Sequence, residues 1–525
     1  MKTLASAALA LLLGLSPAFA QDSGQGPGGQ GPGGQGPGRR NAPQGQAPQG
    51  PSAPEGRRLP PDQTTRHTLE LPDGRTLRFT ATAGSLPLVD DGGRLQAEIA
   101  YTAYALDGAS PSTRPVTFAL NGGPGASSAY LHLTAIGPWR LPVDERTISP
   151  SAPTALVPNA ETWLDFTDLV FIDPVGTGYS RAAGSGDDAN RYYAVDTDAS
   201  VLSAAIARYL RNADRLSSPK FFVGESYGGF RGPLIAGRLQ TEVGVGLSGL
   251  VLLSPVLDFA WLSQPRYTPW AHVTRLPSLA AAALERRGRP ATRAALAEAE
   301  AYAVGDYMLD LVRGVRDPAV VARLSERVAG FTGLDAGVVR RAGGRIGAGL
   351  YQREAERDEG RVASAYDPRV TSFDPDPTAP GGVEDPILTA LKAPLTTAAI
   401  EHGAKTLNWR VADARYELLN NAVNRAWRWG GGRGSAEAVG ALREALALDP
   451  ALRVLVVHGL SDLVTPYFAS KMILDQIPDY GGAGRLALAT YPGGHMFYAR
   501  DASRRAFRAD VAALYEAALA ARRQP

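Results

Sequence analysis

Cysteine is absent from all 525 residues of the sequence. This absence excludes a thiol nucleophile, a cysteine-ligated metal, disulfide bonds and a lipidated N-terminal cysteine. Lysine is scarce too, since only 5 of the 54 basic residues are Lys and the rest are Arg. No group of His, Asp and Glu has the spacing of a metal site such as H-E-x-x-H, so we expect neither a metal nor another cofactor.

An excess of one charge is also lacking. The 54 basic and 52 acidic residues are interspersed and leave a net charge of +2. This balance gives no sign of a nucleic-acid partner. The length fits either one enlarged α/β domain or two domains. No segment after the N-terminus approaches the apolar length of a membrane span.

The N-terminus predicts export. Met1 and Lys2 are followed by an apolar stretch from Leu4 to Leu15, and Ala18-Phe19-Ala20 has the small-x-small pattern of a cleavage site. We therefore expect a signal peptide at residues 1–20, a periplasmic or secreted protein, and no membrane attachment after cleavage. An uncleaved anchor is the alternative, although the apolar stretch is short for a span.

Residues 21–65 consist largely of Gly, Gln, Pro and Ser, and the pentapeptide GQGPG occurs three times among them. Such a segment has almost nothing apolar to bury, so it is expected to be a disordered tether. A binding repeat is the less favoured interpretation. Globular sequence is expected from residue 66 to residue 525.

Short apolar strands alternate with helices in this globular part, which predicts an α/β fold with a mostly parallel central sheet. A β-hairpin and a third strand are expected between residues 67 and 106. Later strands are expected at residues 115–120, 169–172, 221–223, 250–253, 452–457 and 486–490. Residues 259–451 differ, because they are rich in Ala, Arg, Leu and Glu at helical spacing; we expect a largely helical insertion that caps the catalytic edge.

The sequence GESYGG at residues 224–229 follows the apolar run Phe221-Phe222-Val223 and precedes a predicted helix. A G-x-S-x-G element between a strand and a helix is typical of a nucleophile elbow, in which the serine is exposed at the sheet edge. Ser226 is therefore the candidate nucleophile. The backbone N–H of Tyr227 is a candidate oxyanion donor.

A serine nucleophile needs a base, and the base needs an orienting carboxylate. His495 lies in a Gly-rich turn after the last predicted strand, and Asp462 follows the strand before it. The chain order Ser226, Asp462, His495 is that of α/β-hydrolases. Asp173 is the rival orienting acid. The other histidines are interpreted as packing or surface residues: His67, His132, His272, His402 and His458.

A second oxyanion donor is expected from an early loop. The sequence NGGPG at residues 121–125 ends a buried strand, and its glycines let the backbone approach a substrate closely. The N–H of Gly123 is the candidate donor. An ordinary Gly-Pro turn is the alternative.

These motifs together resemble the serine carboxypeptidase family. The resemblance rests on LNGGPGASS at residues 120–128, DPVGTGYS at 173–180, GESYGG at 224–229, the Asp462 loop and GHM at 494–496. It implies an α/β-hydrolase fold, a triad of Ser226, Asp462 and His495, and an oxyanion hole of Gly123 and Tyr227. It also implies that Asn121, Gly122 and Glu225 hold the terminal carboxylate of the substrate.

Two departures from the family pattern affect that carboxylate site. The family commonly has Trp where this chain has Ala119, and it has a Glu that pairs with the elbow Glu where this chain has Ala135. The carboxyl pair that raises the pKa of the elbow Glu is therefore incomplete. A protonated Glu225 could still donate to a substrate carboxylate, which predicts that free acids bind best at acidic pH.

The first interpretation is thus an exported bacterial serine carboxypeptidase that acts on peptides through an acyl-enzyme on Ser226. An esterase, an acyltransferase or a broader peptidase on the same scaffold is the alternative, because Ala119 and Ala135 weaken the carboxylate site. A non-catalytic binding protein is a third, less favoured interpretation. The intact set of Ser226, Asp462 and His495 argues against it.

Overall fold

The computed structural model describes residues 58–143, 149–262, 267–379, 383–430, 434–482 and 484–522. The predicted signal peptide and residues 21–57 of the predicted tether lie outside this part. The tether boundary at residue 65 is too late. Leu59 is buried, the backbone N–H of Arg58 donates to Glu98 Oε2 at 2.8 Å, and strand β1 already begins at Gln63.

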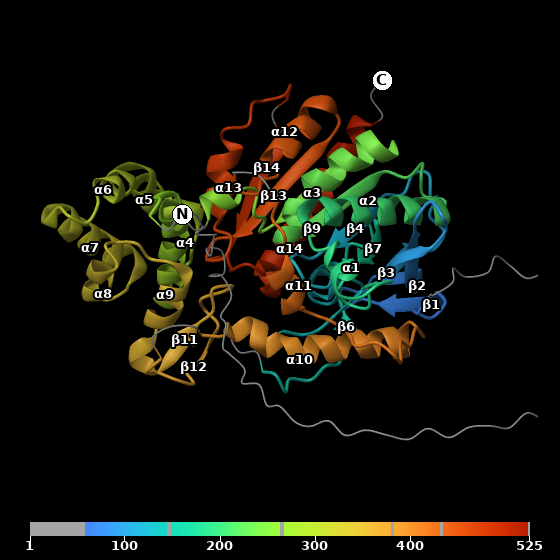
Figure 1. The fold of residues 1–525 in the computed structure, drawn as a ribbon, viewed down its shortest axis with the longest axis horizontal. Helices are drawn as coiled ribbons and strands as arrows, with labels where there is room; N and C mark the ends of the chain where they lie inside the picture. Colours follow the sequence, from blue (N-terminus) through green and yellow to red (C-terminus); the bar gives the residue numbers. More distant parts are fainter. Residues whose placement is uncertain are drawn as a thin grey trace, which may run out of the picture.

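A ten-stranded sheet forms the centre of the molecule, in the order β1-β2-β3-β7-β4-β9-β10-β13-β14, with β8 paired to β3 (Figure 1). Strands β1, β2, β3 and β7 pair antiparallel, and the strands from β7 to β14 run parallel. The predicted mostly parallel sheet is therefore confirmed. The strands are β1 (Gln63–Glu70), β2 (Thr76–Val89), β3 (Leu95–Leu106), β4 (Val116–Leu120), β7 (Asp168–Ile172), β8 (Arg181–Ala182), β9 (Lys220–Glu225), β10 (Gly249–Leu253), β13 (Arg453–Gly459) and β14 (Leu486–Tyr491).

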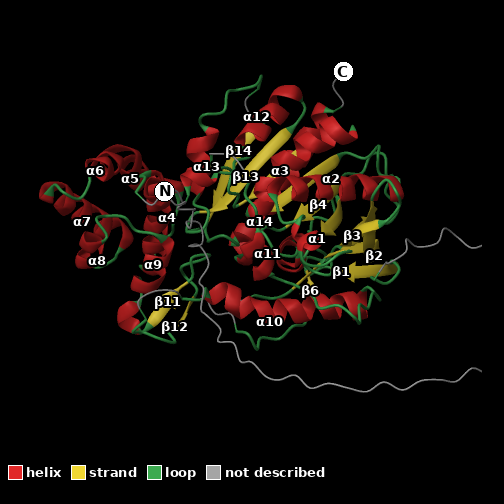
Figure 2. Ribbon diagram, viewed as in Figure 1, coloured by secondary structure: helices red, strands yellow, loops and turns green. Residues whose placement is uncertain are grey.

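Helices cover both faces of this sheet (Figure 2). The last helix packs on one face through Phe507, Val511 and Tyr515, while α2, α3 and α12 pack on the other. Because both faces are covered, β4, β7, β9 and β10 are buried along their whole length and consist mainly of apolar residues. The helices of these layers are α1 (Asp187–Asn190), α2 (Val195–Asn212), α3 (Tyr227–Arg238), α12 (Val439–Leu448), α13 (Tyr467–Leu474) and α14 (Asp501–Ala521).

The segment between β10 and β13 is mainly helical. Its first part forms a lobe beside the sheet with its own apolar core, which includes Val273, Leu324 and Tyr351 (Figure 1). The lobe contains α4 (Trp270–Arg286), α5 (Arg293–Tyr302), α6 (Met308–Arg313), α7 (Pro318–Thr332), α8 (Ala336–Arg341), α9 (Ala348–Glu354) and the hairpin of β11 (Arg361–Ala363) and β12 (Thr371–Phe373).

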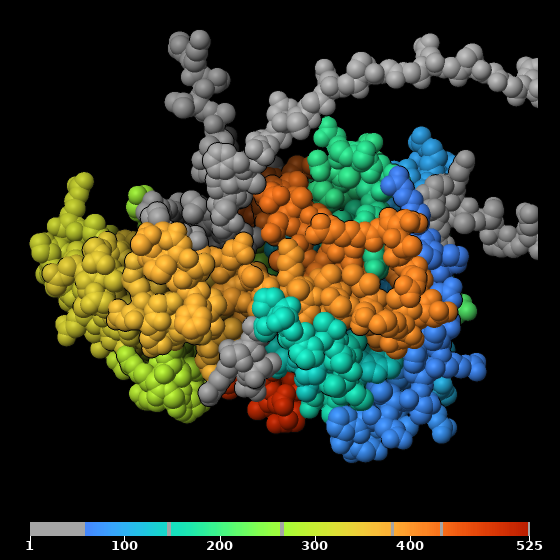
Figure 3. All heavy atoms as spheres, turned by 90° about the horizontal axis from the view of Figure 1, so that it is seen from below, coloured from blue at the N-terminus to red at the C-terminus, as the bar shows by residue number. Residues whose placement is uncertain are grey.

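The second part of this segment returns to the body of the molecule. Helix α10 (Pro386–Glu401) packs through Ile387, Leu391 and Leu395 on the segment that follows β4, and the two lie side by side at the surface (Figure 3). Helix α11 (Asn421–Ala426) follows, and β5 (Trp139–Arg140) pairs with β6 (Val157–Pro158) nearby. Helix α12, which the sequence pattern assigns to the cap, instead packs on the sheet through Leu442 and Leu446.

None of the helices within the described residues combines the length and apolarity that a membrane span requires.

Candidate active site

Ser226 lies at the turn between β9 and α3, as the sequence predicts. Its backbone has φ 60° and ψ −123°, a conformation that non-glycine residues rarely adopt. The turn is tight, since a Cβ on Gly228 would lie 2.5 Å from the carbonyl oxygen of Leu120. Ser226 is partly exposed, whereas Glu225 and Tyr227 on either side are buried. The elbow therefore presents the serine at the carboxyl edge of the sheet.

Asp462 and His495 follow the neighbouring strands β13 and β14 at the same edge. The Nδ1 atom of His495 lies 2.8 Å from Oδ2 of Asp462, and both side chains are buried. The two residues are 33 positions apart in the chain, and the parallel pairing of β13 and β14 brings them together. An imidazole held by a buried carboxylate has one tautomer fixed, which leaves Nε2 to accept a proton.

Asp462 is itself held by several donors. Its Oδ1 accepts hydrogen bonds from the backbone N–H groups of Val464 and Thr465, at 2.8 and 3.0 Å. The hydroxyl of Thr465 lies 2.7 Å from Oδ2 of Asp462 and 3.1 Å from Nδ1 of His495. Thr465 thus fixes the carboxylate against the imidazole, a role that the sequence motifs did not reveal.

The protonated form of His495 is stabilised by its neighbours. Burial disfavours the charged ring, but Asp462, and then Glu225, outweigh burial and raise the pKa of His495 above its usual value. A base with a raised pKa accepts a proton readily. It must, however, be deprotonated before it can act, so its activity is lost at acidic pH.

The loop that carries His495 is held by a residue of the insertion. The carbonyl of Tyr366 accepts the hydrogen bond of the His495 backbone N–H, and the Tyr366 ring meets the imidazole edge-on at 5.1 Å. On the sheet side, the hydroxyl of Ser254 donates to the carbonyl of His495 at 2.8 Å. The region after β10 therefore contributes directly to the site.

The early Gly-rich loop packs against the elbow. A Cβ on Gly122 would lie 2.5 Å from the backbone nitrogen of Tyr227, so only glycine fits there. Gly123 has φ +99°, which also favours glycine. Tyr227 is the first residue of α3, so its N–H has no acceptor within that helix. The loop and the helix start thus meet where the oxyanion donors are predicted.

Glu225 and Asn121 are in direct contact. The side-chain amide of Asn121 donates to Glu225 Oε2 at 2.6 Å, and its oxygen accepts from the backbone N–H of Leu131 at 2.9 Å. The hydroxyl of Tyr498 lies 3.0 and 2.9 Å from the two oxygens of Glu225. Three residues from separate parts of the chain therefore form one buried polar group beside Ser226.

The pKa of Glu225 is raised above its usual value. Burial is the largest cause, while His495, Tyr498 and Asn121 oppose it by stabilising the carboxylate. The protonated form of Glu225 therefore persists to higher pH than that of an ordinary glutamate. In that form the carboxyl can donate a hydrogen bond to an anion.

Arg231 joins the elbow helix to the Asn121 loop. It is 1% exposed; its Nη1 donates to the carbonyl of Asn121 at 2.6 Å and its Nε donates to Asp198 at 2.5 Å. Its guanidinium also lies 4.7 Å from the centre of the Tyr227 ring. One buried cation thus contacts Tyr227, a predicted oxyanion donor, and Asn121 in the loop that carries the other predicted donor. No sequence motif indicates this role, although Arg231 lies five positions after Ser226.

Asp173 and the remaining histidines are engaged elsewhere. Oδ1 of Asp173 accepts from the backbone N–H of Ser128 at 2.8 Å, while the contact to His495 is made by Asp462. His132 and His402 are buried and share the hydroxyl of Tyr104. His458 is buried beside Ser470, and burial lowers its pKa to about 4.

Among the residues that the motifs did not indicate, Tyr498 had a signal that could have been used. It lies three positions after His495, so the same loop necessarily brings it near the site. Thr465 similarly lies three positions after Asp462. Tyr366 and Arg231 had no such signal, because Tyr366 belongs to the helical insertion and Arg231 has the sequence setting of an ordinary residue on a helix surface.

The parallel sheet, the serine elbow and the aspartate–histidine pair on the last two strands define an α/β-hydrolase. The fold also resembles that of a solved structure, the prohormone-processing carboxypeptidase from Saccharomyces cerevisiae. The two align with a TM-score of 0.55 and 14% identity, over 83% of this chain and 91% of that one.

The sequence comparisons then show which family the chain resembles. The model of the serine carboxypeptidase family matches residues 97–277. Serine carboxypeptidase-like 33 from Arabidopsis thaliana is 31% identical over 28% of this chain and 31% of its own length. The pheromone-processing carboxypeptidase from Yarrowia lipolytica is 30% identical over 30% of this chain and 24% of its own length.

These matches confirm the resemblance to the serine carboxypeptidase family. The matched segments span about a third or less of those relatives. The family match contains the Asn121 loop and the Ser226 elbow and ends before Asp462 and His495. The geometry of the described residues, and not sequence identity, therefore brings the aspartate and the histidine together at the sheet edge where the elbow lies.

Proposed function

We propose that the chain is a serine carboxypeptidase that removes C-terminal residues from peptides through an acyl-enzyme on Ser226. The observation that carries the proposal is the buried contact of Asp462 with His495 at the sheet edge where the Ser226 elbow ends. The family match over residues 97–277 and the contact of Asn121 with Glu225 support it.

In the proposed reaction, Ser226 Oγ attacks the carbonyl carbon of the last peptide bond while Nε2 of His495 takes the hydroxyl proton. The N–H groups of Gly123 and Tyr227 stabilise the oxyanion. The C–N bond breaks as His495 delivers that proton to the leaving amine. Water then attacks the acyl-enzyme, its proton passes to His495, and the shortened peptide leaves as Ser226 recovers its proton.

Asn121, Gly122 and Glu225 hold the terminal carboxylate of the substrate in this proposal. Protonated Glu225 donates to the carboxylate, whereas ionised Glu225 repels it. Its raised pKa supports this role. The same group explains why an endopeptide would bind poorly, since an internal residue offers no carboxylate to satisfy the buried donors.

Export is part of the proposal and rests on the residues before Gln21. The apolar stretch from Leu4 to Leu15 and the motif Ala18-Phe19-Ala20 are its support. Periplasmic and secreted destinations are separated by fractionating cells that express the full chain and sequencing the N-terminus of the product. A mature protein that begins at Gln21 in either fraction supports export, and an uncleaved cytoplasmic product contradicts it.

The activity is tested with one N-blocked dipeptide series prepared as free acid, amide and ester. Wild-type protein and the Ser226→Ala variant are assayed side by side at acidic and neutral pH. We expect a strong preference for the free acid at low pH and loss of all turnover in Ser226→Ala. Ester cleavage without a preference for the free acid would replace the carboxypeptidase assignment by an esterase or acyltransferase. Absence of turnover in both proteins would contradict hydrolysis of these bonds.

A further inference from the structure

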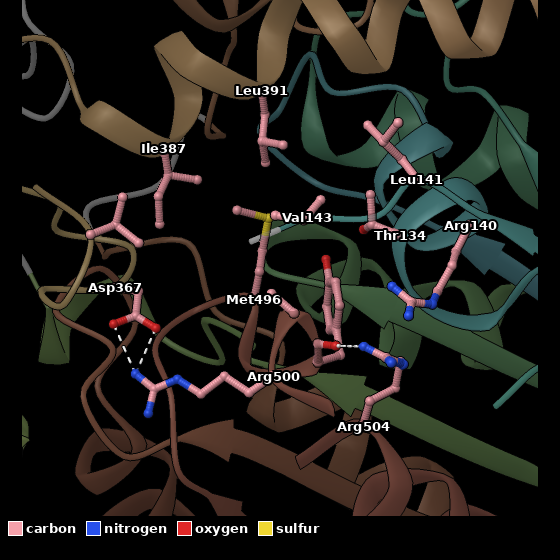
Figure 4. A pocket seen from close by; sticks show the side chains of 13 residues that line it. Thr134, Arg140, Leu141, Val143, Asp367, Ile387, Leu391, Met496, Arg500 and Arg504 are labelled. Atoms are coloured by element: carbon pink, nitrogen blue, oxygen red, sulfur yellow. Dashed lines mark hydrogen bonds and ion pairs between the residues drawn. The ribbon is translucent and has the colours of Figure 1, made fainter. Parts of the chain in front are cut away.

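A pocket is lined in part by residues that follow His495 in the chain. Its walls are largely apolar and include Leu141, Val143, Ile387, Leu391 and Met496 (Figure 4). Met496 directly follows His495, and Tyr498, whose hydroxyl contacts Glu225, forms another part of the wall. Met496 and Tyr498 therefore connect the pocket to the proposed base and to the proposed carboxylate site.

Its position suits it to hold the leaving residue of the proposed reaction. In the proposed reaction, His495 donates its proton to the amine of the residue that is removed, so that residue must lie on the His495 side of the scissile bond. The terminal carboxylate of the same residue lies at Glu225. Met496, which directly follows His495, and Tyr498, which contacts Glu225, both line the pocket. The side chain of the leaving residue then enters the pocket.

Three arginines line this pocket, together with Thr134, Asp367 and Tyr498, and two of the arginines are held by ion pairs. Arg500 donates to Glu285 at 2.6 Å and to Asp367 at 2.7 Å. Arg504 donates to the carbonyl of Tyr498 at 2.9 Å, and it also pairs with Glu161 and Asp501. Their side chains are 7% and 4% exposed, so neither guanidinium is available to a ligand.

Arg140 differs from these two. Within the described residues its one ion pair is with Asp501, at 4.0 Å, and Asp501 is also bound closely by Arg504 at 2.6 Å. The side chain of Arg140 is 22% exposed, and Figure 4 shows its guanidinium pointing into the pocket. Burial and the nearby charge of Arg504 lower the pKa of Arg140. The acidic neighbours of Arg140 therefore stabilise its positive charge only in part.

We propose that Arg140 binds a carboxylate of the substrate's C-terminal residue in this pocket, an inference that rests on the proposed function. A guanidinium binds a carboxylate through two parallel hydrogen bonds, and the apolar walls exclude the water that would weaken them. The apolar walls also suit the methylene groups of the residue that carries the carboxylate.

Two carboxylates of one residue could reach Arg140. The first is the side-chain carboxylate of a C-terminal Glu or Asp, with the α-carboxylate held at Glu225 and Asn121. The second is the α-carboxylate itself. In that case Arg140 contributes to carboxylate recognition in a chain that has Ala135 where the family has a Glu. In both cases Arg140 binds a carboxylate, and peptides that end in Glu, Gln or Leu, as free acids and as amides, distinguish the two cases.

The test measures binding, so that it does not depend on turnover. N-blocked dipeptides that end in Glu, Gln or Leu, each as free acid and as amide, are titrated into the Ser226→Ala variant by calorimetry. The same series is titrated into Ser226→Ala/Arg140→Gln and Ser226→Ala/Arg140→Lys. Ser226→Ala/Arg94→Gln is the matched control, because Arg94 is 84% exposed and its replacement removes one surface charge.

We expect Arg140→Gln to weaken binding of the recognised carboxylate about ten- to a hundredfold, the range of a charged hydrogen bond. Loss of the Glu-over-Gln preference assigns the side-chain carboxylate, and loss of the acid-over-amide preference assigns the α-carboxylate. Arg140→Lys is expected to retain part of either preference. Unchanged affinity for the Leu amide shows that the pocket is intact in each variant.

The inference is overturned if neither preference changes in Arg140→Gln, or if Arg94→Gln lowers both equally. Turnover of the same peptides by protein with Ser226 intact tests the proposed function separately. Turnover of these peptides, with both the Glu-over-Gln and the acid-over-amide preferences unchanged in Arg140→Gln, would reject this inference alone. Carboxylate binding that depends on Arg140, without turnover of any peptide, would reject the hydrolysis and retain the binding site.

Discussion

The hydroxyl of Tyr498 bridges the two carboxyl oxygens of Glu225, at 3.0 and 2.9 Å. The resemblance to serine carboxypeptidases leads one to expect a second carboxyl group beside Glu225, and this chain has Ala135 at that position. Thr134, the neighbour of Ala135, also interacts with the Tyr498 hydroxyl. A phenol therefore contacts the elbow carboxyl in a chain that lacks the second carboxyl group.

This replacement changes the electrostatics of the site. A second carboxyl group would raise the pKa of Glu225 by like-charge repulsion, whereas a phenol hydroxyl donates to the carboxylate and lowers it. Burial still keeps the pKa of Glu225 above its usual value. The chain thus retains a carboxyl that protonates readily, and desolvation is the main cause.

The preference for free acids should fall as the pH rises. The pKa of His495 is raised, so cleavage of every substrate should increase as His495 loses its proton. Only the free acid also needs protonated Glu225, so its advantage over the ester should disappear as the pH passes through the raised pKa of Glu225. The ratio of the two kcat/KM values, measured from about pH 4 to about pH 8, isolates Glu225 because the His495 ionisation cancels. A ratio that stays constant or rises with pH would contradict this role of Glu225.

Tyr498→Phe should shift the loss of the free-acid preference to higher pH. The substitution removes a donor that stabilises the Glu225 carboxylate, so the pKa of Glu225 should rise by about one unit, as expected for one hydrogen bond to a charged group. The ratio of free-acid to ester cleavage is measured as above. Tyr307→Phe is the control, since within the described residues the Tyr307 hydroxyl donates to the carbonyl of Gly344 in the helical lobe and makes no contact with Glu225. A shift to lower pH, or an equal shift in the control, would show that Tyr498 does not set this pKa.

Asp462→Asn should lower kcat by about 10³- to 10⁴-fold with little change in KM. The amide preserves the shape of the side chain. If its NH₂ group faces Nδ1 of His495, it can only donate a hydrogen bond there, and it then favours the tautomer in which Nε2 carries the proton and cannot act as the base. Thr465→Val removes the hydroxyl contacts to Asp462, to His495 and to the carbonyl of Ser254, and it should cost about tenfold, the equivalent of one hydrogen bond. Single-turnover kinetics on the ester substrate measure both. Activity of Asp462→Asn close to wild type would assign the orienting acid elsewhere, with Asp173 as the candidate to test next.

Arg231→Met should destabilise the protein by about 3–5 kcal/mol, because it leaves Asp198 buried without its partner. Replacing both residues, as Arg231→Met with Asp198→Leu, should recover most of that loss. The double variant still lacks the hydrogen bond to the Asn121 carbonyl and the contact with the Tyr227 ring.

Its kcat should therefore remain lowered, by about tenfold, although its stability is recovered. Urea unfolding measures stability, and ester cleavage measures kcat. A double variant with normal stability and normal kcat would restrict Arg231 to a structural role.

Several features of the fold follow from local pattern. The strands β4, β7, β9 and β10 are predicted because buried parallel strands are short apolar runs bounded by turn residues, and the structure confirms them. The Ser226 turn is predicted because closely spaced glycines mark a backbone that a side chain would obstruct. The structure shows the cause, since a Cβ on Gly228 would meet the carbonyl of Leu120.

Other features depend on packing that local pattern does not contain. Helix α12 has the same composition as the helices of the lobe, but its Leu442 and Leu446 complete the core over β10 and β13. The inclusion of Arg58 in the globular part is also hidden from local pattern, because its cause is a contact with Glu98, 40 residues away. In each case the deciding partner lies far along the chain.

The sequence by itself determined the chemical groups, their order and the turns that carry them. Ser226, Asp462 and His495 each follow a strand, and parallel strands end at one edge, so their types and order already indicated a hydrolase. Tertiary structure decided which groups touch and therefore how they ionise. Tyr498 on Glu225, Arg231 on Asn121 and Arg140 in the pocket depend on burial and on approach between distant segments, because a pKa or a binding preference is set by neighbours in space.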